Sequence, residues 1–218
     1  MKQELLIGIT ESGVMHTDAD PPIPLDTKFQ MVKESGVYDY FDKTPPLELE
    51  DDYRRCSEKY ELPILAGGWF YVLGRDEDLL MENLRLGARL GSLVHNTQIM
   101  MDHQDGSLVS DEQVVEIYLR AYETGEACGC RPTFEVHVNM WSEDFRRIEK
   151  VADLVEKHGI PFRMTLDHSH VIFKIDNPRE QEVFNIRESI ENGDLLLDPF
   201  QDNHVCGKWI DRGFVNHC

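Results

Sequence analysis

The stretches TFEVHV (residues 133–138) and FRMTLDHSH (residues 162–170) decide the fold. Each has the composition of a buried strand whose apolar run ends in carboxylate and imidazole side chains. Between them, residues 142–158 have the spacing of one amphipathic helix. Strand, helix and strand make a βαβ unit, whose two strands are parallel and end at the same edge of the sheet. We therefore expect four polar side chains at that edge: Glu135, His137, Asp167 and His170.

The same alternation of apolar runs and amphipathic segments extends over the rest of the chain. The remaining strands are predicted at residues 5–10, 37–41, 62–66, 92–96 and 214–217, the last of them barely begun. The remaining helices are predicted at residues 25–35, 47–60, 76–90, 110–127, 177–191 and 205–212. Ser110 and Gln113 have the spacing of a capping box at the start of one helix.

Strands that alternate with helices predict a parallel sheet covered by helices. Two architectures have this order, a (β/α)₈ barrel and an open doubly wound sheet. No Gly-x-Gly-x-x-Gly follows the first strand, so the main sign of a dinucleotide-binding fold is missing. Polar residues at many strand ends favour the barrel, whose active site collects side chains from several strands. We predict one α/β domain of the (β/α)₈ TIM-barrel type over residues 1–218.

The composition restricts the partners and the compartment. The formal net charge is -19, which argues against nucleic acid and anionic membranes as partners, because both are negatively charged. No apolar run is long enough to span a bilayer, and residues 1–4 lack the apolar region of a signal peptide. We expect a cytoplasmic protein. The cysteines suit that setting, and Cys128-Gly129-Cys130 has the character of a turn at a helix end.

Glu135 and Asp167 are the candidate metal ligands. Ionisable groups that face a barrel interior are costly unless they are paired or bound to a metal. The alternative for Glu135 is a salt bridge to an inward Arg or Lys, and the alternative for Asp167 is the N-cap of the next helix. An Asp followed by His170 at the end of a strand next to Glu135 favours a site. Oxygen and nitrogen ligands there suit a divalent cation.

Two further residues are candidates for substrate binding. Asn96, near the end of the fourth strand, could hydrogen-bond sugar hydroxyls, and a polar loop explains it equally well. Trp69 follows Gly67-Gly68 at the end of the third strand and could form the wall of a pocket. The alternative for Trp69 is a core position, as for most buried aromatic residues.

The Glu-x-His of residues 135–137 and the Asp-x-x-His of residues 167–170 resemble the xylose isomerase-like TIM-barrel superfamily, which includes sugar phosphate isomerases and epimerases. There, one divalent ion is held by a Glu, an Asp, a His and a Glu that follow the fifth to eighth strands. The resemblance gives Glu135 and Asp167 the first two positions. It gives His137 and His170 positions that contact the substrate or, in the endonuclease branch, a further metal.

A full barrel of that superfamily is longer than this chain, so we expect the last one to two βα units to be missing. His217 lies near the place of the seventh-strand ligand, and the last Glu is absent. The chain is then a fragment of a longer product or a barrel completed by another chain.

The resemblance implies a divalent-metal-dependent sugar or sugar phosphate isomerase or epimerase that acts through an enediolate. Glu135 would hold the metal and move a proton at carbon, Asp167 would hold the metal, and His170 would position a substrate oxygen. Mn²⁺ or Mg²⁺ is the expected ion, with Zn²⁺ or Co²⁺ open. The expected partner is a sugar or polyol, and a homo-oligomer remains open. The alternatives are a dehydratase of keto-polyols on the same metal site and an inactive truncated barrel; an endonuclease is disfavoured by the acidity.

Overall fold

The computed structural model describes residues 5–15 and 21–218. Its strands form one sheet in the sequential order β1-β2-β3-β4-β5-β6-β7, and β1–β2, β2–β3, β5–β6 and β6–β7 pair in parallel. The strands are β1 (Gly8–Thr10), β2 (Tyr40–Asp42), β3 (Ile64–Tyr71), β4 (Val94–Ile99), β5 (Arg131–Glu135), β6 (Met164–Thr165) and β7 (Val215–His217). Parallel strands in chain order, alternating with helices, are the arrangement of a TIM barrel. The predicted TIM-barrel-like α/β fold is confirmed, and the missing last units stay a prediction.

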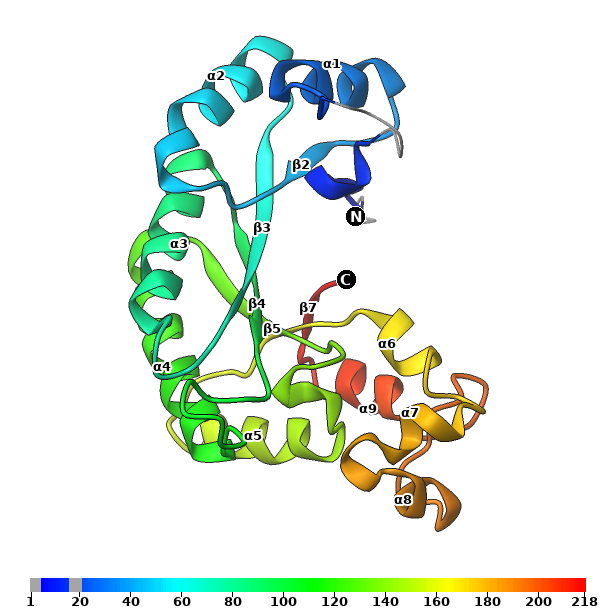
Figure 1. Cartoon of the computed structure of the whole chain (residues 1–218). Coiled ribbons are helices and arrows are strands. Elements are labelled where there is room, and N and C mark those ends of the chain that lie inside the picture. Colours follow the sequence, from blue (N-terminus) through cyan, green and yellow to red (C-terminus); the bar gives the residue numbers. More distant parts are fainter. Residues whose placement is uncertain (1–4, 16–20) are drawn as a thin grey trace. The chain divides into compact units, whose positions relative to one another are not determined.

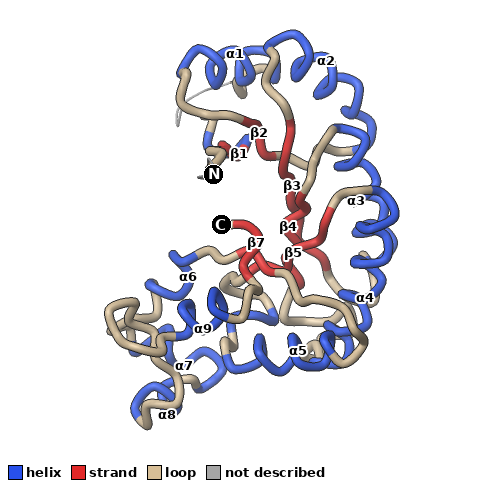
Figure 2. Tube along the Cα trace, turned by 180° about the vertical axis from the view of Figure 1, so that it is seen from behind, coloured by secondary structure: helices blue, strands red, loops and turns tan. Residues whose placement is uncertain are grey.

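Helices follow the strands, and most of them connect one strand to the next (Figure 1). The α-helices are α1 (Leu25–Ser35), α2 (Glu50–Tyr60), α3 (Glu77–Leu90), α4 (Asp111–Cys128), α5 (Arg146–Glu156), α6 (His168–Ile172), α7 (Pro178–Glu182), α8 (Arg187–Glu191) and α9 (Val205–Asp211). The 3₁₀ helices are η1 (Glu11–Gly13), η2 (Leu47–Leu49), η3 (Trp141–Glu143) and η4 (Val183–Asn185). Helices α6 to α9 all lie between β6 and β7 in the chain and gather in one cluster joined by long loops (Figure 2).

The chain divides into two compact units, and the prediction of one domain stays a prediction. Unit 1 comprises Met1–Trp69, Glu82–His95 and Thr124–Arg131, and unit 2 comprises Phe70–Met81, Asn96–Glu123 and Pro132–Cys218. Every candidate site residue except Trp69 belongs to unit 2.

The core of unit 1 is aromatic. Phe29 of α1 stacks on Phe41 of β2 with ring centroids 4.3 Å apart, and Tyr53 of α2 meets Phe29 edge-on at 6.2 Å. All three side chains are buried, and such ring pairs stabilise a fold beyond the area that they bury. The helix α1 ends where it was predicted to end, because Gly36 takes a left-handed conformation (φ 63°) as its C-cap.

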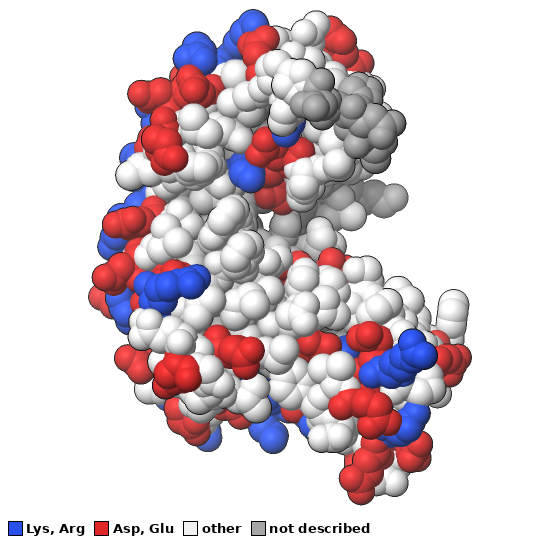
Figure 3. All heavy atoms as spheres, viewed as in Figure 1, with Lys and Arg blue, Asp and Glu red and all other residues white. Residues whose placement is uncertain are grey.

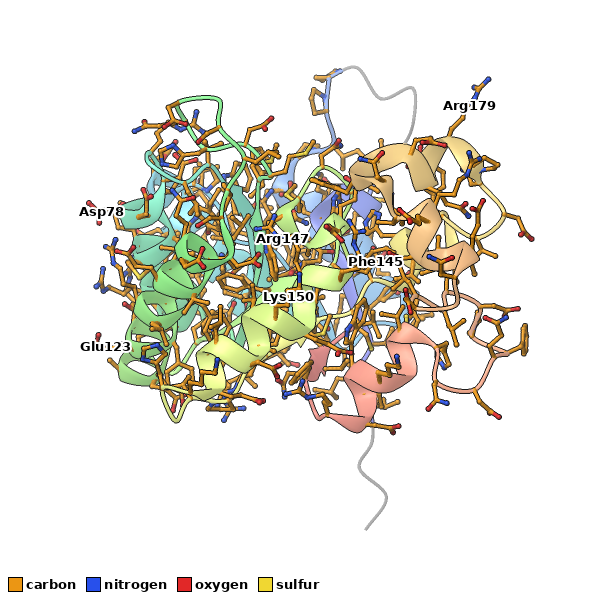
Figure 4. All side chains as sticks on the ribbon, turned by 90° about the horizontal axis from the view of Figure 1, so that it is seen from below. Asp78, Glu123, Phe145, Arg147, Lys150 and Arg179 are labelled. Carbon is orange, nitrogen blue, oxygen red and sulfur yellow. The ribbon has the colours of Figure 1, made fainter. Side chains whose placement is uncertain are left out.

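The core of unit 2 joins the strands that carry the candidate site. Tyr118 of α4 packs against Phe134 of β5 at 4.9 Å and against Phe162 at 5.1 Å, and Phe162 meets Phe214 edge-on at 5.4 Å. Figure 4 labels Phe145 at the start of α5, where its ring lies 6.0 Å from that of Trp209 in α9. These contacts fix β5, β6 and the chain entering β7 on one apolar layer.

The surface carries mixed charge. Over α2, acidic and basic side chains lie next to each other (Figure 3), and the ion pairs Arg54–Glu50 and Arg55–Asp52 belong to this face. Exposed pairs such as Arg55–Asp52 contribute little to stability. No helix within the described ranges has the length and apolar character needed to cross a bilayer.

The boundaries around the candidate site differ from the predicted ones. Strand β5 ends at Glu135, so His137 lies in a loop and not on the strand. Strand β6 is only Met164–Thr165, and residues 168–170 begin α6. The strand prediction was wrong there because the Asp167 side chain accepts a hydrogen bond from the Ser169 amide and starts a helix.

Other boundaries moved for local reasons. The helix predicted at residues 142–158 begins only at Arg146, after η3. The helix predicted at residues 177–191 is broken at Phe184, whose φ of 58° is not helical. Strand β3 continues through Gly67 to Tyr71. A Cβ on Gly67 would lie 2.3 Å from the Thr44 hydroxyl, so glycine is what allows this close approach.

Strands β1, β2 and β4 also differ from their predicted ranges. Strand β1 begins at Gly8, strand β2 begins at Tyr40 and strand β4 runs on to Ile99. Cys128 ends α4 and Gly129 follows with φ 89°, so the predicted helix-end turn is confirmed.

Candidate metal centre

One group of side chains in the described part of the chain has the geometry of a metal site. Glu135, Asp167 and His170 each offer a ligand atom, and these atoms lie within 4.8 Å of one another. Glu135 is the last residue of β5 and pairs with Thr165 of β6 in parallel register. Asp167 comes two residues after Thr165, beyond the end of β6, as the N-cap of α6, and His170 is the third residue of that helix. Parallel pairing of β5 and β6 therefore brings the two carboxylates together, as the sequence predicted.

Glu135 is held from one side by amides. Its carboxylate oxygen Oε2 accepts a hydrogen bond from Asn96 Nδ2 at 2.9 Å and another from Gln98 Nε2. The residue is 6% exposed. Burial raises the pKa of Glu135, and the two amide hydrogen bonds oppose that rise. Both donors are used on Oε2, which leaves Oε1 as the oxygen with no hydrogen bond from the described residues.

Asp167 and His170 form the other half of the group. Asp167 Oδ1 accepts the Ser169 amide hydrogen at 2.8 Å, and its Oδ2 lies 3.4 Å from His170 Nε2. Burial raises the pKa of Asp167, but the hydrogen bonds from Ser169 and the charges of His170 and His137 together outweigh it, so the pKa is lowered. Burial, with the nearby charge of His137, lowers the pKa of His170. Both residues therefore favour the forms that bind metals, a carboxylate and a neutral imidazole.

The loop after β5 supports this group. The ring of His137 lies 4.0 Å from that of His170, and His137 Nδ1 lies 2.6 Å from the Val138 carbonyl oxygen. A proton on Nδ1 satisfies that contact and leaves Nε2 as an acceptor. Ser142 Oγ accepts the His137 amide hydrogen at 3.3 Å and donates to the Glu135 carbonyl at 2.5 Å. The serine thus fixes the chain on both sides of Val136.

The donor set suits a divalent cation. Two carboxylates and one imidazole within reach of one point are a usual ligand set for Mn²⁺, Mg²⁺ or Zn²⁺. The charge of Asp167 also raises the pKa of the buried Glu135, and a cation between the carboxylates would offset that repulsion. These residues fit the divalent ion that the predicted resemblance implies.

The structure brings together Glu135, His137, Asp167 and His170, as expected, and their individual roles stay predictions. Asn96 belongs with them through its bond to Glu135, and its Oδ1 is a buried acceptor with no hydrogen-bond partner in the described residues.

Two other residues lie apart from this group. Trp69, in unit 1, is 38% exposed, and the Lys43 ammonium lies 5.8 Å from its ring centroid. Its role in substrate binding stays a prediction. His217 of β7 pairs with Thr165 and is not one of the three grouped side chains in the described residues.

Sequence reasoning did not connect Gln98 with Glu135, and it missed Ser142. Gln98 could have been found, because it lies two residues after Asn96 and strand alternation puts both side chains on one face. Ser142 gave no signal, since a serine at the start of a predicted helix is expected to be a cap.

No protein-family model and no curated protein sequence matches the chain. Solved structures do match. A 3-keto-D-glucoside 4-epimerase from E. coli has 11% identity over 98% of this chain and 90% of its own, with a TM-score of 0.59. A sugar phosphate isomerase/epimerase from Parabacteroides distasonis has 12% identity over 77% of this chain and 66% of its own, with a TM-score of 0.50. An AP endonuclease of family 2 from Brucella melitensis has 11% identity over 74% of this chain and 79% of its own, with a TM-score of 0.51.

At such identities the likeness concerns the fold. The chain spans 66% of the Parabacteroides protein and 90% of the E. coli epimerase. The matched proteins include both sugar isomerases or epimerases and an endonuclease, so the fold alone does not decide the reaction. At the level of the fold the predicted resemblance is confirmed: the chain shares the TIM-barrel-like fold of these sugar isomerases or epimerases and of the endonuclease.

Proposed function

We propose that this chain binds one divalent cation through Glu135, Asp167 and His170 and acts on a small sugar or sugar phosphate as an isomerase or epimerase. The observation that carries the proposal is the convergence of these three ligand atoms within 4.8 Å. The sugar isomerases and epimerases among the structural matches support the substrate class. The expected setting is cytoplasmic carbohydrate metabolism.

The cation would polarise a substrate carbonyl and so acidify the adjacent C–H, with Mn²⁺ or Mg²⁺ as the expected ion and Zn²⁺ or Co²⁺ open. The residues of the chain would do the rest. Glu135 would bind the cation through one carboxylate oxygen, while Asn96 and Gln98 donate hydrogen bonds to the other. The same carboxylate would take a proton from the carbon next to the carbonyl and return it.

The two histidines would bind and orient the substrate. His170 stands between Asp167 and His137, so its imidazole can serve the cation or a substrate oxygen next to it. His137 presents Nε2 as an acceptor for a sugar hydroxyl, because its Nδ1 faces the Val138 carbonyl. Asn96 stays the further predicted substrate contact, and its Nδ2 donates to Glu135.

The metal can be tested first and without a substrate. Calorimetric titration with Mn²⁺ should show one binding site in the native chain and none in Glu135→Gln or Asp167→Asn. A matched control is Asp78→Asn, since the Asp78 side chain is 94% exposed and pairs only at the surface with Arg120. Unchanged Mn²⁺ affinity in both site variants would refute the site.

The reaction is tested in D₂O with a panel of aldoses, ketoses and their phosphates. Isomerisation or epimerisation by proton transfer should place deuterium on the carbon next to the carbonyl, with a product of unchanged composition. A product that is one water molecule lighter than its substrate would instead identify the dehydratase. Absence of exchange over the whole panel, with Mn²⁺ bound, would contradict the proposed isomerase or epimerase.

A further inference from the structure

Unit 2 contains a lysine that is wholly removed from solvent. Lys174 has 0% exposure; its Nζ donates to Glu143 Oε1 at 2.7 Å and to the Glu180 carbonyl at 3.0 Å. The Glu180 carboxylate lies further away, at 3.6 Å. Taking a lysine and a carboxylate out of water is costly, and apolar residues in their place often stabilise a fold as well or better. The pair therefore needs an explanation other than general stability.

The carboxylate end of the pair belongs to the segment that holds Glu135. Glu143 is the last residue of η3, and its Oε2 accepts the Asn139 amide hydrogen at 2.6 Å. Asn139 has a left-handed φ of 62°, so this bond fixes the turn between β5 and η3. The neighbouring Ser142 donates to the Glu135 carbonyl. Glu143 thus anchors the loop that follows the first candidate ligand.

The ammonium end belongs to the segment that holds the other two ligands. Lys174 follows α6 in a turn closed by the bond from its amide to the Val171 carbonyl at 3.1 Å. It comes four residues after His170, so the two side chains lie on the same side of this helical segment. The ion pair is therefore a near neighbour of the imidazole.

We propose that the Lys174–Glu143 ion pair positions the candidate metal ligands, by tying the loop after Glu135 to the helix that carries His170. The two residues are positioning residues, because they act through the ligands and not on the cation. This inference rests on the proposed function, since it assumes the cation site.

The test uses Mn²⁺ as the probe and three variants of the full chain: Lys174→Met, Glu143→Gln and the double variant. Each single variant leaves a buried charge or polar group unpaired and is expected to lower the melting temperature. The double variant removes both charges and should recover most of that loss. Mutation of residues that support metal ligands typically lowers the metal affinity by about 10- to 100-fold. We expect a loss of about tenfold or more in Mn²⁺ affinity in the double variant, together with a changed Mn²⁺ EPR spectrum.

A matched control is the exposed ion pair Arg187–Glu182, 2.6 Å apart in the same helical region. The double variant Arg187→Met/Glu182→Gln should bind Mn²⁺ as the native chain does. Circular dichroism shows that each variant is folded at the titration temperature. A folded Lys174→Met/Glu143→Gln chain with native Mn²⁺ affinity and EPR spectrum would overturn the positioning role alone. A native chain that binds no Mn²⁺ would instead overturn the proposed function.

Discussion

Gln98 should control the metal affinity although it contacts no metal in the proposed site. Its side-chain amide donates to Glu135 Oε2, the same oxygen that accepts from Asn96. Gln98→Leu keeps roughly the volume of the side chain and removes the donor. Glu135 would then be held by one amide instead of two, and its carboxylate could rotate away from Asp167 and His170.

The size of the effect follows from the bond that is lost. A hydrogen bond to a charged group contributes about 1.5–3 kcal/mol. We take this free energy to stabilise the metal-bound state and not the metal-free state. The Mn²⁺ dissociation constant then rises by about 10- to 100-fold, since about 1.4 kcal/mol corresponds to a factor of ten. Asn96→Ala should have an effect of similar size. The double variant should lose less than the sum, because both amides act on one oxygen.

Calorimetry with Mn²⁺ measures this directly. The control is Ile99→Val, because Ile99 is fully buried next to Gln98 in β4 and its side chain points to the other face. That variant should lose about 0.5–1.5 kcal/mol of stability and no metal affinity. A Gln98→Leu chain whose dissociation constant stays within a factor of two of the native value would refute the reasoning.

Three further predictions concern stability. Burial lowers the pKa of His95 to about 3, so below about pH 6.5 the unfolded chain binds a proton that the folded chain does not, and the folded state loses stability as the pH is lowered. Between pH 7 and pH 5 the free energy of unfolding, measured with urea, should fall by about 2 kcal/mol more in the native chain than in His95→Gln. Tyr118→Phe removes the hydroxyl that donates to the Pro161 carbonyl at 2.8 Å, and thermal unfolding should show a loss of about 1–3 kcal/mol. Gly67→Ala should destabilise by a similar amount, about 1–3 kcal/mol, because the new methyl group would meet the Thr44 hydroxyl at 2.3 Å; a native melting temperature for it would contradict the close approach.

The order of elements and the meeting of Glu135 with Asp167 could be predicted from the sequence, because both follow from one rule. Parallel strands in a βαβ unit end at the same edge, so apolar runs that stop in carboxylates bring those carboxylates together. In the structure, Glu135 of β5 pairs with Thr165 of β6 in parallel register, two residues before Asp167.

The strand ends themselves could not be predicted, because side-chain hydrogen bonds set them. Strand β5 stops before His137, so a loop and not the alternation of a strand positions this imidazole, with its ring 4.0 Å from that of His170. The bond from Ser142 to the Glu135 carbonyl joins residues that no periodicity links. The Lys174–Glu143 pair is hidden for the same reason, since a lysine in a polar segment predicts exposure.

Asp167 uses its two oxygens for different tasks, one on the Ser169 amide and one facing His170. An asparagine could still start the helix but would bring no charge, and a glutamate would bring the charge but is a poor helix cap. No other natural side chain meets both demands at once. Binding of a cation should for the same reason slow hydrogen exchange at the backbone amides of α6. Formation of this short helix and occupancy of the ion site are then thermodynamically coupled through Asp167.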